Sequence, residues 1–597
     1  MGVLEDRAGV EKAIEGRTVA DLLLETAERH SDAPAFTHGE QTLTWAETRR
    51  QVLRIAAAFT ALGLETGDSV ALMMPNRTEH VLADLGVVHA GGVPTTLYAT
   101  LAPEQVAYVA GDCSARYAVL EGQDQLDRWR PVLSRLPALR GIIVLDDCPT
   151  GEPFLAWEEF LRLGEGECDR WRDLTPDSTL TVLYTSGTTG NPKGVVITQR
   201  MALYECQVSA STSGVPDGNI GVSYLPFAHI ADRVLSIYLP LIRGSHVFFC
   251  PDPAQLPAVL ATARPHGFFG VPRVWEKMMA AIQAVLGAEQ DESRRDAIAS
   301  AMAAGRAYVE SREYGRETSP AVLAAFERAD ATVLAPMRAL IGLDRVRHAL
   351  SAAAPLPIEV ARFFAGLGLC ILDVYGMTET TGAVTANQPD AFKLGTVGQA
   401  LPGIEIRLAG DGEILVRGGT CTPGYLNLPS ETTSLLDDAG WVHTGDLGEI
   451  DADGFLSVVD RKKEVIITAG GENIAPSLIE NLLKEHPLIG QALAYGDGRR
   501  YVVALLTLDA EVAPVWAAAR GIEGDLAVLA AHPVVREEIT RGVETANGRL
   551  ARVQQVKRWR LLPDEWTAET EELTPTLKLK RRVIHARYTD AIDELYA

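Results

Sequence analysis

The sequence has few cysteines, and none of them falls into a recognisable pairing pattern. Seven cysteines are scattered singly along 597 residues, without a C-x-x-C pair and without a histidine at zinc-ligand spacing. This distribution excludes a disulfide scaffold, and no feature supports a catalytic cysteine. We therefore expect reduced, mostly buried thiols in a cytoplasmic protein. The seven are Cys113, Cys148, Cys168, Cys206, Cys250, Cys370 and Cys421.

Long apolar runs are also missing. The longest uncharged run lies between Asp84 and Glu104 and contains His89, three glycines and two prolines, so it predicts buried turns rather than a membrane-spanning helix. The first 17 residues are charged throughout, which argues against a signal peptide. We expect no integral membrane segment, and transient membrane contact stays open.

An excess of basic residues is absent as well. Lysine and arginine number 55 against 79 aspartates and glutamates, a net charge of −24. A protein of this charge lacks the general basic surface that binds nucleic acid, although a local pocket can still bind a polyphosphate. The composition, 47% hydrophobic and 22% charged, is that of a globular protein with large cores.

Strand-like and helical segments alternate through the first half of the chain. Apolar strand patterns cover residues 68–74, 117–120 and 141–145, and an amphipathic helix is predicted from Trp45 to Leu62. This alternation predicts an α/β fold with layered subdomains around largely parallel sheets.

Two later segments depart from that alternation. Residues 276–345 are rich in Ala, Arg and Glu at helical spacing, so we predict a helical insertion that serves mainly as an outer packing layer. Residues 403–418 are punctuated by glycine and rich in strand formers, which predicts a distorted antiparallel or barrel-like β-rich subdomain.

The pattern changes again after Asp460, where the charged stretch DRKKE precedes a compact α+β pattern. A helix over 476–486 and strands over 491–495 and 501–508 are predicted there. We therefore predict a large domain over 1–459, a hinge over 460–463 and a small domain over 464–597.

The strongest local motif is YTSGTTGNPKG, residues 184–194, which follows the strand-like run TLTVLYT. Glycines allow a ligand close to the backbone, hydroxyl groups donate hydrogen bonds, and Lys193 adds a positive charge. The combination suits phosphate groups, although it lacks the spacing of a Walker loop. A flexible surface loop is the alternative interpretation.

A second motif, YGMTET at residues 375–380, follows the apolar run GLCILDV. A strand that ends in Gly, Thr and Glu places polar side chains at the edge of a sheet, where α/β proteins bind ligands. Glu379 is a suitable Mg²⁺ ligand beside substrate phosphates. Thr378 and Glu379 also suit a helix N-terminus, and both interpretations can hold together.

Three further motifs mean less in isolation. Asp446 lies in a TGD turn, where it suits a ribose diol or serves simply as a turn residue. DRKKE holds Arg461 and Lys463, and LTPTLKLKRR holds Lys578. Basic runs of this kind are usually solvated surface.

Together and in this order, the five motifs closely resemble the adenylate-forming superfamily of acyl-CoA synthetases, peptide-synthetase adenylation domains and beetle luciferases. The resemblance runs from about Leu22 to about Arg582. Within it the chain is most similar to the long-chain fatty acyl-CoA synthetases, because of LPFAHIADRV with His229, FFGVPRVWEKM with Trp275, and the helical insertion.

The resemblance implies an ATP-dependent ligase that activates a long-chain or bulky apolar carboxylic acid as an acyl-adenylate and transfers it to coenzyme A. Lys578, Thr378, Glu379 and His229 would be catalytic, and Glu379 would bind Mg²⁺ with Thr185. His229, Trp275 and Ala354 would line the acyl pocket. The implied ATP-binding residues are Thr185, Ser186, Gly187, Thr188, Thr189, Lys193, Ala353, Asp373, Tyr375, Gly376, Thr378, Asp446, Arg461 and Lys578.

The resemblance also implies a mobile C-terminal lid that turns about Lys463 between adenylation and thioester formation. One departure is the loop SAAAPL, where related proteins often carry glycines, and the added methyl groups narrow the space near the adenine and the acyl carbonyl.

Two other functions stay open. One is an enzyme that loads a separate carrier protein, although no carrier-like domain follows Arg582. The other performs only the thioester half-reaction on a supplied acyl-adenylate. A non-catalytic relative is disfavoured because the charged motif residues are all present. The sequence leaves the acyl group undefined and a homodimer open.

Overall fold

The computed structural model describes residues 6–185, 191–574 and 578–597. Its first large sheet has five parallel strands in the order β4–β3–β5–β6–β7. The strands predicted over 68–74, 117–120 and 141–145 are confirmed as β3, β5 and β6. The strands are β3 (Ser69–Met73), β4 (Val93–Thr96), β5 (Tyr117–Leu120), β6 (Gly141–Val144) and β7 (Phe154–Ala156).

Helix α3 (Trp45–Ala61) confirms the predicted amphipathic helix. It begins with a capping box, because the Thr44 hydroxyl accepts from the backbone N–H of Glu47 and the Glu47 carboxylate accepts from the N–H of Thr44. Its buried face packs on α4 (Thr78–His89), and the two form part of the largest hydrophobic core.

The uncharged run between Asp84 and Glu104 is buried as far as Leu97, but the prediction that it forms turns is wrong for most of its length. Its first residues complete α4 and its middle forms β4. The Gly91–Gly92 pair provides the turn between them, and Gly91 has a positive φ of 81°. Apolar composition therefore reflects a helix and a strand that are both enclosed by protein.

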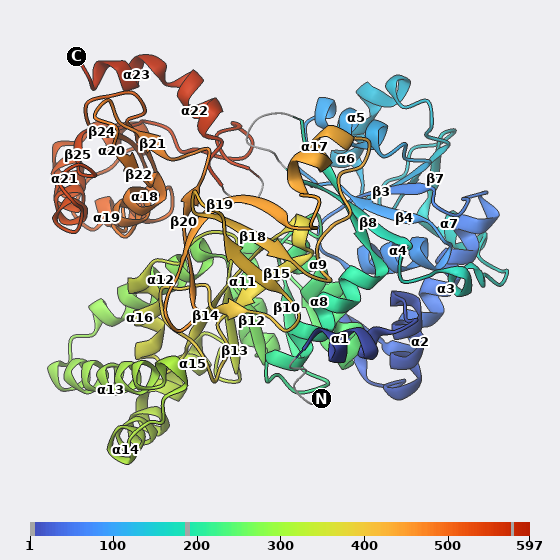
Figure 1. Ribbon diagram of the computed structural model, residues 1–597, viewed down its shortest axis with the longest axis horizontal. Helices are drawn as coiled ribbons and strands as arrows, with labels where there is room; N and C mark the ends of the chain where they lie inside the picture. Colours follow the sequence, from blue (N-terminus) through green and yellow to red (C-terminus); the bar gives the residue numbers. More distant parts are fainter. Residues whose placement is uncertain (1–5, 186–190, 575–577) are drawn as a thin grey trace.

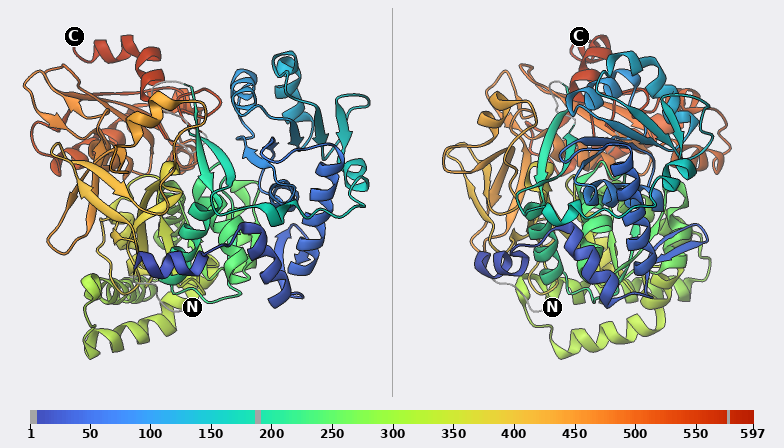
Figure 2. Two further views of the ribbon diagram at one scale, coloured as in Figure 1. Left: turned by 45° about the vertical axis from the view of Figure 1, so that its right-hand side comes forward. Right: turned by 90° about the vertical axis from the view of Figure 1, so that its right-hand side faces the viewer.

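Two mixed sheets complete the layers of the large domain (Figures 1 and 2). One has the order β10–β11–β1–β2, and the other has the order β12–β13–β14–β15–β16, which changes from parallel to antiparallel pairing at β14. Their strands are β1 (Pro34–His38), β2 (Gln41–Thr44), β10 (Ile220–Ser223), β11 (His246–Phe249), β12 (Gly267–Phe269), β13 (His348–Ser351), β14 (Ile371–Met377), β15 (Gly382–Ala386) and β16 (Gln399–Ala400).

A hairpin and an antiparallel sheet frame the ligand-binding motifs. The hairpin joins β8 (Thr179–Thr185) to β9 (Lys193–Thr198). The predicted β-rich segment lies in a four-stranded antiparallel sheet. Its strands are β17 (Glu405–Leu408), β18 (Glu413–Arg417), β19 (Val442–Ile450) and β20 (Leu456–Arg461).

Residues 276–345 are helical, as predicted, and they project from one side of the molecule (Figures 1 and 2). The segment starts inside α12, which itself begins at Pro272. Its helices are α12 (Pro272–Ala288), α13 (Glu292–Ser311), α14 (Pro320–Ala329) and α15 (Ala335–Leu340).

The C-terminal part has its own two cores, and every buried member of these lies at or after Ile466. A sheet in the order β23–β24–β25 forms its centre. The predicted helix and strands correspond to α18 (Pro476–Lys484), β23 (Ile489–Tyr495) and β24 (Val502–Leu508); β25 spans Val556–Leu561. A large domain with a small α+β domain agrees with the predicted fold class, whereas the boundaries 1–459, 460–463 and 464–597 stay predictions.

Several further elements surround these sheets. They are α1 (Arg7–Ile14), α2 (Val19–Arg29), α5 (Pro103–Asp112), α6 (Gln123–Trp129), α7 (Trp157–Arg162), α8 (Gln199–Thr212), α9 (Ile230–Arg233), α10 (Leu239–Arg243), α11 (Leu256–Ala263), α16 (Ile358–Gly366), α17 (Pro429–Leu435), α19 (Val512–Ala518), α20 (Leu526–Ala531), α21 (Pro533–Gly548), α22 (Arg581–Arg587), α23 (Thr589–Glu594), β21 (Ile466–Ile467) and β22 (Asn473–Ile474).

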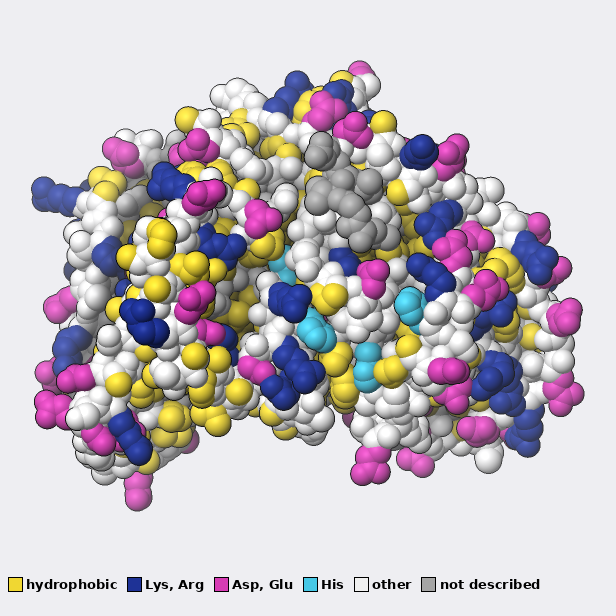
Figure 3. All heavy atoms as spheres, turned by 90° about the horizontal axis from the view of Figure 1, so that it is seen from below, with side chains coloured by type: hydrophobic (Ala, Val, Ile, Leu, Met, Phe, Trp, Pro, Cys, Tyr) yellow, Lys and Arg dark blue, Asp and Glu magenta, His cyan; other side chains and the backbone are white. Residues whose placement is uncertain are grey.

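The surface carries charges of both signs. On the face drawn in Figure 3, basic side chains are interspersed with acidic ones. Among the described residues, no helix combines the length and the apolar character that crossing a membrane requires.

Candidate functional site

Most of the predicted site residues line one cavity of about 760 Å³ between the large domain and the C-terminal part. They come from separate elements: the β8–β9 hairpin, α9, the loop after β13, β14, β19, β20 and the segment before α22. Ser186, Gly187, Thr188 and Thr189 lie outside the described residues. Those that line the cavity are Thr185, Lys193, His229, Ala353, Ala354, Asp373, Tyr375, Gly376, Thr378, Glu379, Asp446, Arg461, Lys463 and Lys578.

Lys193 opens β9 and pairs in register with Thr185 at the end of β8. Its ammonium forms an ion pair with Glu431 of α17 and lies 5.0 Å from the centre of the Tyr425 ring. The hydrogen bond from Lys193 lowers the pKa of Glu431. Lys193 is therefore held at the cavity wall by a carboxylate that an incoming phosphate group would replace.

The YGMTET motif runs from β14 into the short 3₁₀ turn η7 (Thr378–Thr380). Strand β14 continues to Met377, three residues further than the apolar run suggests. The Glu379 carboxylate is buried, and its Oε1 accepts a 2.8 Å hydrogen bond from the Tyr425 hydroxyl. Tyr425 thus contacts both Glu379 and Lys193, and it links the two motifs across the cavity.

Gly376 has no room for a side chain. A Cβ atom at this position would lie 1.7 Å from the carbonyl oxygen of Gly382, because β14 and β15 approach each other closely at a register shift. Only glycine allows this approach. The close packing fixes the direction in which Thr378 and Glu379 leave the strand.

Asp446 and Arg461 lie opposite each other on β19 and β20. Arg461 Nε is 2.8 Å from one carboxylate oxygen of Asp446, and the Tyr375 hydroxyl donates to the other at 2.7 Å. Burial raises the pKa of Asp446, and the nearby Arg461 charge opposes that shift. Each oxygen retains a second lone pair, so the fixed carboxylate can also accept hydrogen bonds from a ribose diol.

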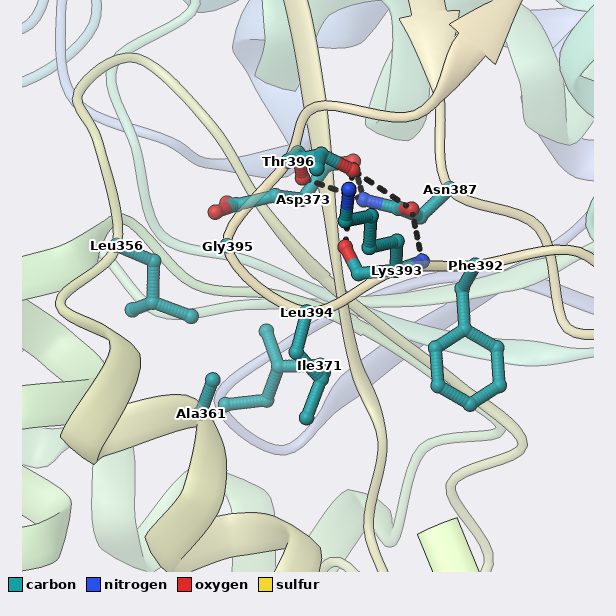
Figure 4. A pocket seen from close by; sticks show the side chains of 10 residues that line it. All are labelled: Leu356, Ala361, Ile371, Asp373, Asn387, Phe392, Lys393, Leu394, Gly395 and Thr396. Carbon is teal, nitrogen blue, oxygen red and sulfur yellow. Dashed lines mark hydrogen bonds between the residues drawn. The ribbon is translucent and has the colours of Figure 1, made fainter. Parts of the chain in front are cut away.

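Asp373 and Ser351 present unsatisfied polar atoms. Burial raises the pKa of Asp373 to about 8, and its Oδ1 and the Ser351 Oγ have no hydrogen-bond partner among the described residues. Figure 4 shows the residues that line a small pocket of about 10 Å³; the Asp373 carboxyl group points away from the Asn387 side chain. Buried polar groups without a partner can form hydrogen bonds with a polar heterocycle such as adenine.

The loop after β13 has strained backbone at Ala353, whose φ is 75°. This left-handed conformation is uncommon for a residue with a Cβ. The sequence departure noted in SAAAPL therefore falls on a position whose geometry favours glycine.

Lys578 lines the cavity from the C-terminal part. Burial beneath the surrounding protein and the positive charge of Arg461 lower the pKa of Lys578, whereas Asp446, Glu379 and Glu464 favour its charged form. The ammonium group therefore lies within electrostatic range of the Asp446–Arg461 pair and of Glu379.

His229 is the N-cap of α9 and lines the same cavity as Lys578. Its Nδ1 accepts a 3.3 Å hydrogen bond from the Ala231 N–H, so the neutral ring carries its proton on Nε2. Burial and the charge of Lys578 lower the pKa of His229 to about 4. The imidazole is neutral at physiological pH and faces the cavity as a hydrogen-bond donor.

The predicted hinge lies beside the same cavity. Lys463 is exposed there, and its charge contributes to the lowered pKa of Glu431. The next residue, Glu464, pairs with Arg581, which also makes a bidentate ion pair with Glu480 of α18. The segment that follows Lys463 is thus anchored to the C-terminal part.

Trp275 requires a correction, because it does not line the cavity. Its side chain is fully buried, its Nε1 donates to the Leu350 carbonyl, and its ring meets Phe268 and Phe364 edge to face. Trp275 is therefore a core residue of α12 rather than part of an acyl pocket wall. Its indole N–H finds its partner inside the protein.

Two residues that line the cavity, Tyr425 and Glu205, and one that pairs with Lys193, Glu431, were missed in the sequence. Glu431 follows a proline in an unremarkable polar segment, Tyr425 lies 46 residues after Glu379, and Glu205 lies inside a helix. Each reaches the site through tertiary packing. The only available signal was Glu205 itself, the one acidic residue of α8.

Comparison with known proteins decides the family. The model of the AMP-binding enzymes matches residues 23–426, and the model of the AMP-binding enzyme C-terminal domain matches residues 463–597. The chain belongs to the AMP-binding enzyme family. This adenylate-forming membership agrees with the resemblance of the five motifs.

Individual members of the family are similar over most of the chain. FadD11 of Mycobacterium tuberculosis is 44% identical over 72% of this chain and 75% of its own length. The long-chain fatty-acid–CoA ligase ACSBG2 of Xenopus laevis is 34% identical over 97% of this chain and 84% of its own length. FadD15 of Mycobacterium bovis, also a long-chain fatty-acid–CoA ligase, is 33% identical over 93% of this chain and 92% of its own length.

Solved structures of AMP-binding enzymes share the fold. The adenylation domain of a carboxylate reductase from Mycobacterium chelonae superposes with a TM-score of 0.78 at 21% identity, covering 100% of this chain and 94% of that one. The o-succinylbenzoate CoA synthetase of Bacillus subtilis, solved with its acyl-adenylate, superposes with a TM-score of 0.68 at 21% identity, covering 94% of this chain and 97% of that one.

Proposed function

We propose that this AMP-binding enzyme is a fatty-acid–CoA ligase that works through an acyl-adenylate. The observation that carries the proposal is the position of Lys578, which enters the cavity of the large domain beside Asp446, Glu379 and His229. The relatives named as long-chain fatty-acid–CoA ligases support the substrate class.

In the first half-reaction a carboxylate oxygen of the acid attacks the α-phosphorus of ATP, and pyrophosphate leaves. Lys578 bonds both the carboxylate and the α-phosphate and offsets their charge as they approach, an electrostatic and positioning task. Thr378 donates to the α-phosphate, and the neutral His229 donates from Nε2 near the acyl carboxyl group.

The remaining cavity residues hold the nucleotide. Thr185 and Lys193 bind the terminal phosphates, Asp446 and Arg461 bind the ribose, and the adenine lies against Tyr375 and the Ser351–Pro355 loop beside Asp373. Ser186, Gly187, Thr188 and Thr189, which lie outside the described residues, belong to the same proposal as further phosphate contacts. Ala353 and Gly376 contribute backbone rather than side chains.

Mg²⁺ fits the donor set at Glu379. Magnesium binds through one or two carboxylates together with substrate phosphates, so a single buried glutamate with the Thr185 hydroxyl nearby suffices. The described residues hold no cluster of three or more His, Cys, Asp or Glu side chains suited to a metal, which fits an ion that arrives with ATP. When bound, the ion would offset charge on the leaving pyrophosphate.

The second half-reaction needs a different face of the C-terminal domain. We propose that the domain turns about Lys463, withdraws Lys578 and admits coenzyme A, whose thiolate displaces AMP from the acyl carbon. Exposed hinge residues at a domain boundary suit such a motion because they absorb large changes of backbone dihedral angle. The proposal includes a cytoplasmic location, and a homodimer stays open.

Two alternatives involve the same cavity. The activated acyl group could be passed to a carrier protein, or the protein could act only on a supplied acyl-adenylate. The carboxylate reductase domain shares the fold, but at 21% identity that likeness carries no argument about the acceptor.

The test is mass spectrometry of the products after incubation with ATP, Mg²⁺, coenzyme A and a panel of carboxylic acids. The ligase predicts stoichiometric AMP and acyl-CoA from at least one long or bulky acid. If AMP forms without acyl-CoA, and an acyl thioester appears only when a phosphopantetheinyl carrier protein is added, the acyl acceptor is a carrier protein and not coenzyme A. If a thioester forms only from synthetic acyl-adenylate, the protein performs only the second half-reaction.

A further inference from the structure

One wall of the cavity is polar beyond the residues that serve the nucleotide. Glu205, Ser209 and Thr212 of α8, together with its C-cap Ser213, all line the cavity. Spacings of four, three and one residues place them along one face of the helix. Other side chains of α8, among them Met201, Leu203, Tyr204 and Val208, belong to the large hydrophobic core.

Glu205 is the most constrained member of this polar wall. It is 3% exposed, and its Oε1 accepts hydrogen bonds from the Ala383 N–H at 3.1 Å and the Ser209 hydroxyl at 3.3 Å. Its Oε2 has no partner among the described residues. Ala383 lies in β15, only four residues after Glu379, so Glu205 stands next to the place where the acyl-adenylate would form.

The protonation state of Glu205 suits a hydrogen-bond donor. Burial raises the pKa of its carboxyl group to about 8. At neutral pH the group is therefore mostly a neutral acid, with one O–H to donate and lone pairs to accept. A charged carboxylate in the same place would oppose a neutral lipid-like ligand, whereas the neutral acid does not.

The polar wall continues to a second buried group at its far end. Arg243 of α10 lines the cavity and is 5% exposed; its guanidinium binds the carbonyls of Val215 and Ala210 and the Ser213 hydroxyl, while its Nε has no partner among the described residues. From Glu205 to Ser213 the helix rises about 12 Å at about 1.5 Å per residue.

Other lining residues are apolar, so the cavity is amphipathic along its length. They include Val215, Val222, Leu235, Leu239, Val247 and Phe268. An unsubstituted alkyl chain would fill the volume but would leave Glu205 Oε2 and Arg243 Nε unpaired and shielded from water, which is unfavourable. A chain or ring system that carries an oxygen would pair at least one of them.

We propose that the preferred acid carries a hydroxyl or carbonyl oxygen on its apolar skeleton and that Glu205 selects it by a direct hydrogen bond. The inference rests on the proposed ligase function and narrows its substrate class. Thr212 and Ser213 would contact oxygens placed further from the carboxyl end.

The test compares kcat/KM for acid-dependent AMP release with tetradecanoic acid and with its isomeric monohydroxy and monooxo derivatives. The wild-type protein is expected to prefer at least one oxygenated isomer by about tenfold or more, because a site built to pair a polar group rejects an analogue that lacks it. Glu205→Met, of similar size, is expected to remove that preference, and Glu205→Gln, which keeps a donor and an acceptor, to retain most of it.

Two further variants separate recognition from a folding defect. Thr212→Val is nearly isosteric and is expected to weaken the preference for the isomers oxygenated further along the chain. Ser211→Ala is the matched control, because Ser211 is a buried hydroxyl of the same helix that donates to the Val208 carbonyl and does not line the cavity. It is expected to leave the preference unchanged.

Equal use of plain and oxygenated acids by the wild-type protein would overturn the proposal while leaving the ligase intact. A preference that survives Glu205→Met in folded protein would also overturn it. If no acid yields AMP or acyl-CoA, the ligase function fails and this inference fails with it.

Discussion

Lys578 gains its chemical character from residues far away in the sequence. Desolvation and the Arg461 charge lower its pKa, while Asp446 and Glu379 keep the charged form within reach. The sequence supplies only a basic run of ordinary appearance, and its assignment came from resemblance to a family. The structure adds the reason that this lysine differs from its neighbours, which is its position in the cavity between the two parts of the chain.

The lowered pKa of Lys578 predicts an alkaline limit to adenylation. The ammonium is charged below its pKa, so acid-dependent pyrophosphate exchange should fall as pH rises through a value below the roughly 10.4 of a free lysine. The Lys578→Arg variant keeps its charge over this pH range, so its exchange rate should not fall at alkaline pH, although the rate is lower than that of the wild-type protein. An unchanged alkaline limb in the arginine variant would assign the titration to another group.

Ala353 allows a second prediction at the residue scale. A left-handed φ of 75° costs an alanine roughly 1–2 kcal/mol, part of which glycine recovers after its own entropy cost of roughly 0.5–1 kcal/mol. Ala353→Gly should therefore leave the free energy of unfolding unchanged or raise it by up to about 1 kcal/mol in urea titrations.

Ala352→Gly is the matched control, because Ala352 is not among the residues with positive φ. It should lose roughly 0.5–1 kcal/mol. Equal losses in the two variants would show that the conformation of Ala353 is not strained.

At the scale of elements, the spacing of apolar residues predicted those helices and strands that local contacts determine. Strands β3, β5 and β6, helix α3, and the pair β23–β24 all lie within a few residues of their predicted positions. Their signals are repeated apolar residues, capping residues and turn residues, which act over short distances.

The mistakes concern tertiary packing. Residues 84–104 are apolar because α4 and β4 are enclosed by neighbours, and no local signal distinguishes that from buried turns. Trp275 follows a motif that resembles part of an acyl site, yet Phe268, Phe364 and the Leu350 carbonyl hold it in the core. The polar wall of α8 was missed because the sequence does not tell which face of a helix meets a cavity.

The junction of β14 and β15 gives a prediction at this scale. Gly376→Ala places a methyl group 1.7 Å from the Gly382 carbonyl oxygen, so the two strands must separate. We expect a loss of roughly 3 kcal/mol or more, or failure to fold, since backbone cannot move aside as a flexible side chain does.

The matching variant is Gly410→Ala, where the added methyl group has no neighbour within 4 Å among the described residues. Its melting temperature should change by less than about 2 °C. A Gly376→Ala protein as stable as Gly410→Ala would mean that the close approach of β14 and β15 is absent.

At the scale of the whole molecule, the C-terminal part is held in one orientation by more than Lys578. Arg273 and Lys277, one turn apart on α12, pair with Asp509 and Glu511 of the C-terminal part. Asp460 also accepts from the backbone N–H of Ser477 at the start of α18. The Lys277–Glu511 ion pair is exposed and contributes little stability, whereas the Asp509 side chain of the other pair is buried. A small set of polar contacts suits an interface that forms and separates during a reaction cycle.

Reversing the exposed pair should shift the balance between orientations. Lys277→Glu places like charges opposite each other and should slow acid-dependent pyrophosphate exchange roughly twofold to fivefold, as expected for about 0.5–1 kcal/mol. Thioester formation from supplied acyl-adenylate should not slow. The double variant Lys277→Glu with Glu511→Lys should restore the rate of pyrophosphate exchange. A double variant as slow as the single one would show that this ion pair does not stabilise the adenylation orientation.

The central claim is that Lys578 serves adenylation from its place in the cavity and leaves it for thioester formation. The most direct measurement follows both half-reactions separately in wild-type and Lys578→Ala protein, by acid-dependent exchange of labelled pyrophosphate into ATP and by acyl-CoA formation from synthetic acyl-adenylate. We predict a loss on the order of 10²- to 10³-fold in the exchange and a change of less than about threefold in the second step. An equal loss in both steps would contradict the account.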